Sequence, residues 1–133
     1  ESMKLALDDA EISPESIGYI NAHGTGTRLN DPLECRAIKR VFGDRSVKLP
    51  VSSSKSLFGH AMGASSALEA LATLLAVQND CAPPTLNCDD LDPECVIDPV
   101  PYNSRKVQIE AALSNSFAFG GSNAVLVFRK WKP

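Results

Sequence analysis

The chain has 133 residues, of which 44% are hydrophobic and 22% are charged, a length and composition typical of one globular domain. Its formal net charge of −3 gives no electrostatic reason to bind nucleic acid or an anionic membrane, so we expect neither as a partner. The longest apolar-looking stretch, 66–77, contains Glu69 and is too short to cross a bilayer. Because the chain also lacks a signal-peptide pattern, we expect a cytoplasmic protein.

Cysteine spacing argues against a metal site. The chain has four cysteines, with no CxxC pair among them and no histidine close by: Cys35, Cys81, Cys88 and Cys95. Zinc sites depend on closely spaced cysteine and histidine ligands, so we expect no bound metal. Without an export signal, we interpret all four cysteines as reduced thiols that pack in the core or in loops.

The start of the chain predicts a helix, a turn and a strand. Met3 and Leu7 are spaced as on one face of a helix. Because the chain begins inside this pattern and without an initiator methionine, we expect further residues upstream. The stretch SPES (13–16) offers a cap and a proline for a short helical turn. Residues 17–22 then predict a strand that leads into a glycine bend.

A second helix is predicted to begin in the stretch DPLE (31–34). Asp31 can cap it, and Pro32 suits the first helical position. Glu34 stands where a capping box places its carboxylate, so we interpret Asp31 and Glu34 as such a box. Apolar residues then recur at helical spacing until Gly43 ends the pattern.

A short strand at 49–54 precedes the bend that holds His60. Behind this bend, apolar residues repeat at helical spacing as far as Leu75, which predicts a third long helix. The helix opens with the small residues of 63–66, so it can lie close to another backbone. We expect this helix to be mostly buried.

Two strands are expected near the C-terminus. Alternating apolar residues over 107–113 predict a half-buried strand, whereas the apolar run 124–128 predicts a central strand buried on both faces. The order β-α-β-α-β-β describes an α/β fold, a mixed sheet covered by helices that ends in an antiparallel pair. Three strand ends, at Ala22, Ser54 and Ser116, lead into glycine-rich bends that can converge on one pocket.

Each of the two histidines is adjacent to a glycine: His23 stands directly before Gly24 in NAHGTGT (21–27), and His60 directly after Gly59 in KSLFGHAMGAS (55–65). His60 precedes a helix, whose positive N-terminal end disfavours an imidazolium. We expect His23 and His60 to be buried, neutral hydrogen-bond donors. Two such donors aimed at one point stabilise an oxyanion or enolate, each by on the order of 3 kcal/mol in a dry site. A single histidine in a bend is more often a satisfied structural residue.

Other polar residues of these bends have two interpretations each. Lys55, five residues before His60, can carry positive charge beside a neutral histidine or can be a solvated surface lysine. Thr25 and Thr27 offer hydroxyl groups to a polar ligand arm, or they form hydrogen bonds within a turn. The residue types alone leave both interpretations open.

Three stretches resemble the C-terminal signature blocks of the elongating β-ketoacyl-[acyl-carrier-protein] synthases, the condensing enzymes of fatty-acid and polyketide synthesis: NAHGTGT, KSLFGHAMGAS and NSFAFGGSNA (115–124). They occur in the family's order and spacing, and the resemblance covers nearly the whole chain. It implies a thiolase-like fold in which residues 1–133 form the C-terminal ketosynthase domain, one half of a layered α/β/α/β/α architecture. The N-terminal half, with the nucleophilic cysteine, would then lie upstream.

The resemblance implies an activity, the decarboxylative Claisen condensation of malonyl-acyl carrier protein with an acyl thioester. His23 and His60 match the family's histidine pair, which holds the malonyl thioester oxygen as the enolate develops. Lys55 matches the lysine that organises this pair. Glu69 matches a glutamate that supports the site structurally, and we give Asp31 and Glu34 a similar supporting role.

Substrate contacts follow from the same resemblance. Thr25 and Thr27 correspond to threonines that hydrogen-bond the phosphopantetheine arm of the acyl carrier protein, so no free cofactor is expected. Phe119 matches the gating phenylalanine, whose backbone N–H helps form the acyl-transfer oxyanion hole. Gly120 and Gly121 would let this loop change shape. The expected partners are acyl carrier protein, the N-terminal half and a second copy in a homodimer.

The chain departs from the family in two ways. Ala118 stands where the family usually has glycine, which could stiffen the gate. None of the four cysteines lies in a nucleophile-elbow context, and Cys35 falls within the second predicted helix. We therefore expect these residues alone to be inactive in condensation.

Two other functions compete with the enzyme. A chain-length-factor-like partner subunit, or a module for carrier-protein binding and dimerisation, would share the fold without catalysis; retention of both histidines argues for the enzyme instead. A thiolase acting on coenzyme A esters resembles this fold but usually has a second cysteine in a C-G-G block. Here the corresponding stretch is FAFGGSN (117–123), which has no cysteine.

Overall fold

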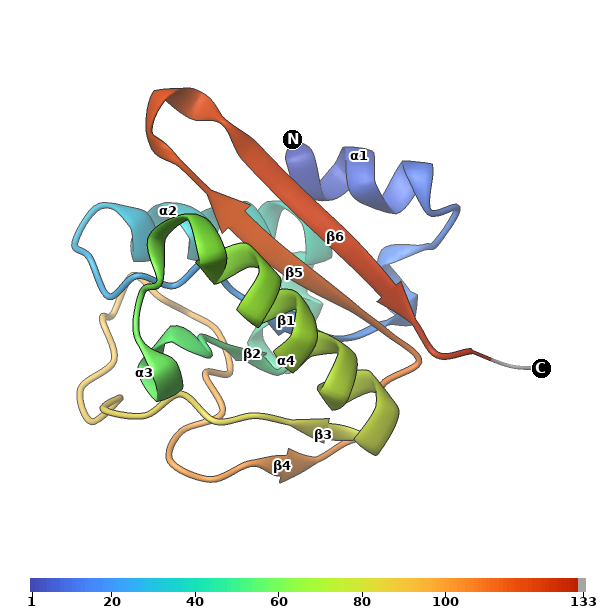
Figure 1. Ribbon diagram of the computed structural model, residues 1–133. Helices are drawn as coiled ribbons and strands as arrows, with labels where there is room; N and C mark the ends of the chain where they lie inside the picture. The colour runs from blue at the N-terminus through green and yellow to red at the C-terminus, as the bar shows by residue number, and fades with distance from the viewer. Residues whose placement is uncertain (132–133) are drawn as a thin grey trace.

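The computed structural model describes residues 1–131. Its main sheet has four strands in the spatial order β2-β1-β5-β6, which span Val51–Ser52, Ile17–Asn21, Ala111–Phe117 and Asn123–Arg129. Strand β1 runs parallel to both β2 and β5, whereas β5 and β6 pair antiparallel (Figure 1). The predicted mixed sheet with a C-terminal antiparallel pair is therefore confirmed.

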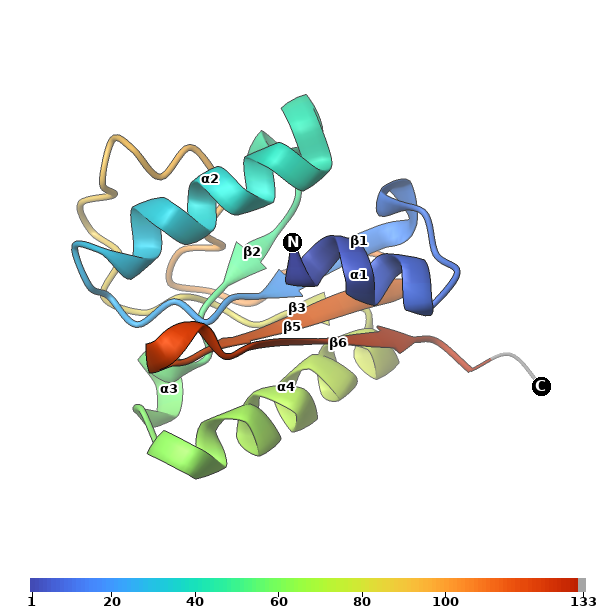
Figure 2. The ribbon, with the colours of Figure 1, turned by 90° about the horizontal axis from the view of Figure 1, so that it is seen from above.

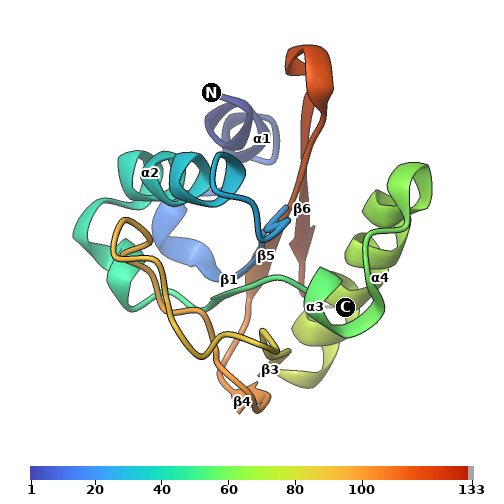
Figure 3. The same cartoon turned by 90° about the vertical axis from the view of Figure 1, so that its left-hand side faces the viewer.

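Helices cover both faces of this sheet. Helices α1 (Ser2–Asp9) and α2 (Asn30–Phe42) lie on one face, and α4 (Ser65–Asn79) lies on the other (Figure 2). The short helix α3 (Lys55–Phe58) lies on the same side as α4 (Figure 3). Two further short strands, β3 (Cys81–Ala82) and β4 (Arg105–Lys106), pair antiparallel with each other. Four 3₁₀ turns complete the described elements: Pro14–Ser16, Gly43–Val47, Met62–Ala64 and Phe119–Gly121.

Strand β1 separates two hydrophobic clusters. Ile17 and Ile20 face the cluster that includes residues of α1 and α2, such as Leu7 and Ile38. Tyr19 faces the second cluster, which includes Val77 of α4. The sheet is thus buried on both faces at β1, which fixes the position of the loop that follows this strand.

The central strand is not the one that the sequence predicted. Strand β5, Ala111–Phe117, is buried over its first five residues, whereas β6, Asn123–Arg129, lies at the sheet edge and is largely exposed. The prediction of a central strand at 124–128 is wrong. The run is apolar on both faces because Val125 and Val127 pack toward one cluster and Phe128 toward the other, although β5 is the one strand that pairs with β6 in the described residues.

Helix α4 is also less buried than predicted. Its buried positions include Ser65, Glu69 and Thr73, whereas four leucines are between 40 and 57% exposed: Leu68, Leu71, Leu74 and Leu75. The prediction of a mostly buried helix is therefore wrong for the described residues. Its polar face packs on the sheet, and its leucine face is open.

The described residues contain neither a membrane-spanning helix nor a metal-binding cluster. No helix within residues 1–131 is long and apolar enough to cross a bilayer. In the same range, no three histidine, cysteine or acidic side chains gather as a metal site would require. All four cysteines are free thiols. Burial raises the pKa of both Cys35 and Cys95, which keeps these two side chains in the unreactive thiol form.

Gly18 in β1 provides a test of this packing. A Cβ at this position would lie 2.8 Å from the backbone oxygen of Gln108, so Gly18→Ala must displace the chain that leads into β5. We expect it to lower the free energy of unfolding by about 1–3 kcal/mol, measured by urea denaturation. Gly63→Ala is the matched control, since a Cβ there meets nothing within 4 Å. Equal stability of the two variants would contradict the close approach.

Candidate active site

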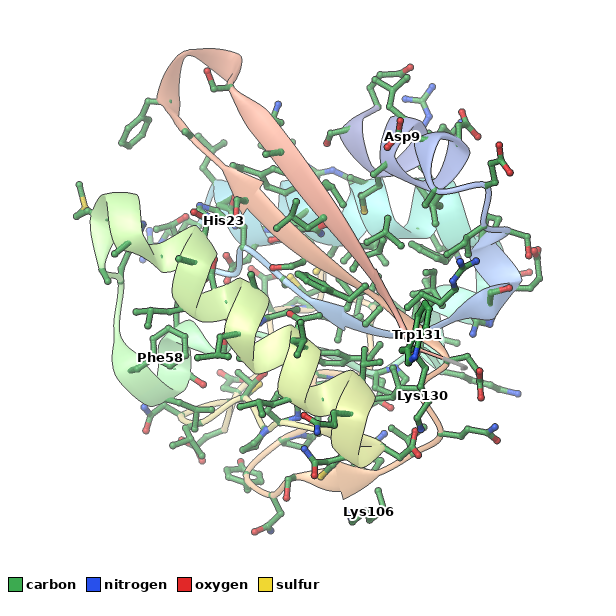
Figure 4. All side chains as sticks on the ribbon, turned by 45° about the vertical axis from the view of Figure 1, so that its right-hand side comes forward. Asp9, His23, Phe58, Lys106, Lys130 and Trp131 are labelled. Atoms are coloured by element: carbon green, nitrogen blue, oxygen red, sulfur yellow. The ribbon has the colours of Figure 1, made fainter. Side chains whose placement is uncertain are left out.

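The three predicted strand ends meet at one edge of the sheet. Strands β1, β2 and β5 are mutually parallel along β2-β1-β5, so their C-terminal ends lie together. His23 follows β1, Lys55 begins the helix after β2, and Phe117 ends β5. Figure 4 shows His23 at this edge. The ring centroids of His23 and Phe117 are 5.6 Å apart, so the convergence predicted from the sequence is confirmed.

The two histidines lie side by side. Their ring centroids are 6.0 Å apart and the ring planes are perpendicular. At this separation, ring N–H groups of both residues can reach a single acceptor atom placed between them. The structure thus brings His23 and His60 together, as the sequence predicted.

His23 is held as a neutral imidazole. The Lys55 ammonium donates to the His23 backbone oxygen at 2.7 Å and lies 3.4 Å from the ring Nδ1. Burial, followed by the positive charge of Lys55, lowers the pKa of His23 to about 4. Because an ammonium can only donate, Nδ1 must be the acceptor and the ring proton must be on Nε2.

His60 reaches the same protonation pattern by a different route. Its Nδ1 accepts a hydrogen bond from the backbone N–H of Met62 at 3.1 Å, and the Ser65 hydroxyl lies 3.0 Å from the same nitrogen. The backbone donor keeps the proton on Nε2 here as well. The prediction that His60 is buried is wrong, because the loop between α3 and α4 leaves it exposed at the rim of the site.

A buried ion pair supports the histidines. Lys55 contacts Oε1 of Glu69, and the two side chains are only 5 and 1% exposed. Burial raises the pKa of Glu69, and the Lys55 ammonium opposes this change. The second oxygen of Glu69, Oε2, has no hydrogen-bond partner among the described residues. Lys55 is therefore buried and paired beside His23, and the interpretation of a solvated surface lysine is wrong.

Glu34 stabilises the His23 loop and does not cap its own helix. Its two carboxylate oxygens accept hydrogen bonds from the backbone N–H groups of His23 and Gly24, each at 2.9 Å. Helix α2 begins at Asn30 and has no side-chain cap from Asp31 or Glu34. The capping-box interpretation is therefore wrong. The β1–α2 loop lies over the start of α2, and its backbone N–H groups, not those of the helix, bond the Glu34 carboxylate.

Asp31 and Thr27 fix the rest of this loop. Asp31 accepts a hydrogen bond from the Gly26 N–H at 3.2 Å. The Thr27 hydroxyl accepts one from the N–H of Asn30, the first residue of α2, also at 3.2 Å. Thr27 thus supplies the hydrogen bond at the helix start that the sequence assigned to Asp31.

Gly24 lets the loop approach the chain after β2. Its φ is +38°, and a Cβ there would lie 2.6 Å from the Cβ of Ser53. The Ser53 hydroxyl donates to the Gly24 oxygen at 2.6 Å. Any side chain at position 24 would push His23 away from Lys55, so this glycine is a geometric requirement of the site.

Two buried asparagines were not singled out from the sequence. The Asn115 amide donates to Oε1 of Glu34 at 3.0 Å, and the Asn21 amide donates to the Glu69 backbone oxygen at 3.0 Å. Both are fully buried near strand ends. Both also lie inside the quoted motifs. Asn21 ends the otherwise apolar strand β1, which was an available signal, whereas Asn115 lies within β5 between two serines.

A cavity of about 580 Å³ opens beside His60. Its lining includes Thr25, Thr27, Lys55 and His60, together with the long loop that contains Cys95. The hydroxyl oxygens of Thr25 and Thr27 are 3.0 Å apart. The two threonines are therefore hydrogen-bonded to each other in the wall of a cavity that His60 also lines.

The glycine-rich loop between β5 and β6 is exposed, unlike the buried Lys55–Glu69 pair. Phe119 is fully exposed, and the φ angles of Gly120 and Gly121 are +80° and +83°. Ala118 has an extended backbone, with φ of −132°, so alanine fits this position without strain. The ring that touches His23 is Phe117, which the sequence analysis did not single out.

The fold and the site together define a class of protein. Two neutral imidazoles over a buried lysine–glutamate pair, at the strand ends of a mixed α/β sheet, can stabilise negative charge on an oxygen atom. This arrangement suits acyl-transfer or enolate chemistry, and it agrees with comparisons to known proteins. Residues 1–89 match the family described as "Beta-ketoacyl synthase, C-terminal domain", and the chain belongs to this family.

Individual relatives agree with this assignment. The chain is 51% identical over 128 residues to 3-oxoacyl-[acyl-carrier-protein] synthase 2 of Coxiella burnetii, which covers 96% of this chain and 31% of the relative. It superposes with a TM-score of 0.94 on the ishigamide ketosynthase/chain length factor, at 43% identity over 98% of this chain and 32% of the other. A type II polyketide ketosynthase, solved with its acyl-carrier protein, gives 0.94 at 38% identity, again over 98% and 32%. The chain spans about a third of these relatives, and the predicted family and thiolase-like fold are confirmed.

The protonation of His23 can be tested directly. We expect its ring to titrate with a midpoint of about 4, against 6.5 for an ordinary histidine, followed by the ring ¹⁵N and ¹H NMR signals as pH is lowered. As pH falls from 6.5 toward 4, the unfolded state takes up this proton first, so His23 contributes a loss of stability in that window. Glu34 and Glu69 have raised pKa values and act with the opposite sign, so a residue-specific titration is required. A midpoint near 6.5 would contradict the site geometry.

The buried ion pair gives a second test. Lys55→Met and Glu69→Gln each leave one polar partner buried and unpaired, so each should lower the free energy of unfolding by about 3–5 kcal/mol. The double variant should lose less than the sum of the two, measured by chemical denaturation. Arg36→Ala, which removes an exposed ion pair with Glu94, is the control and should cost at most about 1 kcal/mol. Strict additivity would show that the pair is not coupled.

Proposed function

We propose that the protein to which this chain belongs is a 3-oxoacyl-[acyl-carrier-protein] synthase. It would catalyse the decarboxylative Claisen condensation of a malonyl-carrier protein with an enzyme-bound acyl group. One observation carries the proposal: His23 and His60 lie 6.0 Å apart, and fixed donors occupy Nδ1 of both rings. This leaves two Nε2–H groups free to bind one thioester oxygen.

In the proposed reaction, the malonyl thioester oxygen binds between the two Nε2–H groups. The bond from the methylene carbon to the carboxylate breaks and carbon dioxide leaves. The electron pair of the broken bond stays with the methylene carbon and is delocalised onto the thioester oxygen as an enolate. The carbanion carbon then attacks the acyl thioester and expels the cysteine thiolate. His23 and His60 stabilise the oxygen while it carries negative charge, which requires them to remain uncharged donors.

Lys55 and Glu69 act behind the histidines. The Lys55 ammonium fixes His23 through its backbone oxygen and its Nδ1, and it lowers the pKa of that ring. Glu69 holds the ammonium in place. Glu34, held against the His23 loop, and Asp31 give the loop its shape. We assign these four residues to orientation and electrostatics, and not to proton transfer.

The remaining site residues would contact the carrier arm. We assign Thr25 and Thr27 to the phosphopantetheine arm, which the acyl carrier protein brings, because their hydroxyl groups line the cavity that reaches His60. We assign Phe119, with Gly120 and Gly121, to a gate. Its support is the exposed, glycine-rich turn at the tip of the β5–β6 hairpin.

The chain does not supply the nucleophile, so the proposal needs further protein. The leucine face of α4 (Leu68, Leu71, Leu74 and Leu75) is exposed, and we propose that the N-terminal half of the same protein covers it and brings the cysteine. We also propose a homodimer, and acyl carrier protein as the transient partner. The reaction would take place in the cytoplasm, where the four free thiols stay reduced.

A non-catalytic partner subunit is the second candidate. It is favoured by one observation, the high similarity to a structure described as a ketosynthase/chain length factor. The two candidates differ in the residue at the nucleophile position, upstream of the present sequence. A cysteine there, acylated by an acyl-carrier protein, supports the synthase; a residue that accepts no acyl group supports the partner subunit.

Replacement of the histidines tests the proposed function. In the full-length protein, His23→Ala and His60→Ala should each lower the rate of malonyl decarboxylation by about 10²–10³-fold, because each removes one donor to the enolate oxygen. Carbon dioxide release from malonyl-carrier protein is the measurement. Acylation of the nucleophilic cysteine, followed by intact mass, should survive in both variants.

The control is Lys39→Ala, which removes only an exposed ion pair with Asp44 and should leave both steps unchanged. Decarboxylation at the unmodified rate in either histidine variant would defeat the proposal. Loss of acylation together with decarboxylation would indicate misfolding, which a parallel thermal denaturation would reveal.

A further inference from the structure

We propose that Ser65 is a positioning residue for His60. This inference rests on the proposed function, because it assigns Ser65 to the orientation of one of the two donors. Ser65 is the first residue of α4 and is only 4% exposed. Its hydroxyl lies 3.0 Å from Nδ1 of His60, and it would hold the ring so that Nε2 faces the substrate oxygen.

The Ser65 hydroxyl is committed to the histidine. The N-cap residue of α4 is Ala64, and the helix has no side-chain cap, so Ser65 is the first residue within the helix and its hydroxyl does not serve as a cap. Among residues 1–131, the hydroxyl has His60 as its side-chain partner. Because buried polar groups are paired, a hydroxyl of a buried residue whose side-chain partner is an imidazole indicates a role at that ring.

The direction of this hydrogen bond follows from its neighbour. The Met62 backbone N–H also points at Nδ1, at 3.1 Å, and it can only donate. Nδ1 therefore carries no proton, so the Ser65 hydroxyl donates as well. The ring is held from two directions, by the backbone between α3 and α4 and by the helix itself.

His60 needs this second contact more than His23 does. His23 is half-buried, with Lys55 behind it and the ring of Phe117 beside it. His60 is exposed on a loop, and Met62, its other partner, has a left-handed backbone with φ of +49°. Ser65 connects the His60 ring to α4. The same helix carries Glu69, which holds Lys55 against His23, so α4 helps to position both histidines.

The test is a set of variants in the full-length protein. Ser65→Ala should lower kcat for malonyl decarboxylation by about three- to tenfold, the effect of one net hydrogen bond, with KM for malonyl-carrier protein unchanged. Ser65→Thr keeps the hydroxyl and should restore most of the rate. Ser66→Ala, at the exposed neighbouring position, is the matched control and should behave as the unmodified protein.

A spectroscopic readout separates this inference from the proposed function. In ring-¹⁵N-histidine protein, the Nδ1 signal of His60, assigned by its absence in His60→Gln, should shift in Ser65→Ala and stay in place in Ser66→Ala. An unchanged signal, or an unchanged kcat in Ser65→Ala, would overturn the role of Ser65. Equal losses in Ser65→Ala and Ser65→Thr, at normal thermal stability, would overturn it too. If instead the His60 Nδ1 signal shifts in Ser65→Ala but His60→Ala retains full activity, the contact between Ser65 and His60 stands and the proposed function fails.

Discussion

The site depends on one buried ammonium group. Lys55 joins three elements that are far apart in the sequence, because its Nζ contacts the His23 oxygen after β1 and the Glu69 carboxylate on α4, and its own backbone begins α3. A charge this deeply buried is stable only with an opposite charge and a full set of acceptors. The rest of the site follows from meeting that requirement.

The requirement extends outward to a layer of buried polar groups. Glu69 must face the sheet to reach Lys55, so the buried side of α4 is polar at Ser65, Glu69 and Thr73. The Thr73 hydroxyl and the Asn21 amide both bond the Glu69 backbone oxygen. On the opposite face of the sheet, Glu34 and Asn115 hold the His23 loop by the same kind of contact. His23 is thus fixed from both faces of the sheet.

The sequence predicted the site more reliably than its surroundings. Glycine bends at parallel strand ends placed His23, Lys55 and His60 together, because strand direction alone brings such ends to one edge. Side-chain partners that cross between elements were not predictable in this way. Glu34 has the local spacing of a capping box, and only the tertiary fold shows that its carboxylate bonds the loop after β1 instead. Burial was misjudged for the same reason, since the run 124–128 gives no sign of which strand has a second neighbour.

Helix α4 has a buried side that is largely polar and an exposed side that carries leucines, and both follow from the need to place Glu69 against Lys55. On the side that packs on the sheet, α4 buries Ser65, Glu69 and Thr73, which satisfy hydrogen bonds and an ion pair, and its apolar contribution there comes from Ala76 and Val77 near its C-terminal end. Its leucines must then find an apolar surface elsewhere to contribute to stability, and in the described residues they remain exposed. Glu69, which contacts Lys55, thus lies on the buried side of the helix, and the leucines lie on its exposed side. The buried polar groups near His23 and the exposed leucines are, in this fold, two sides of the same helix.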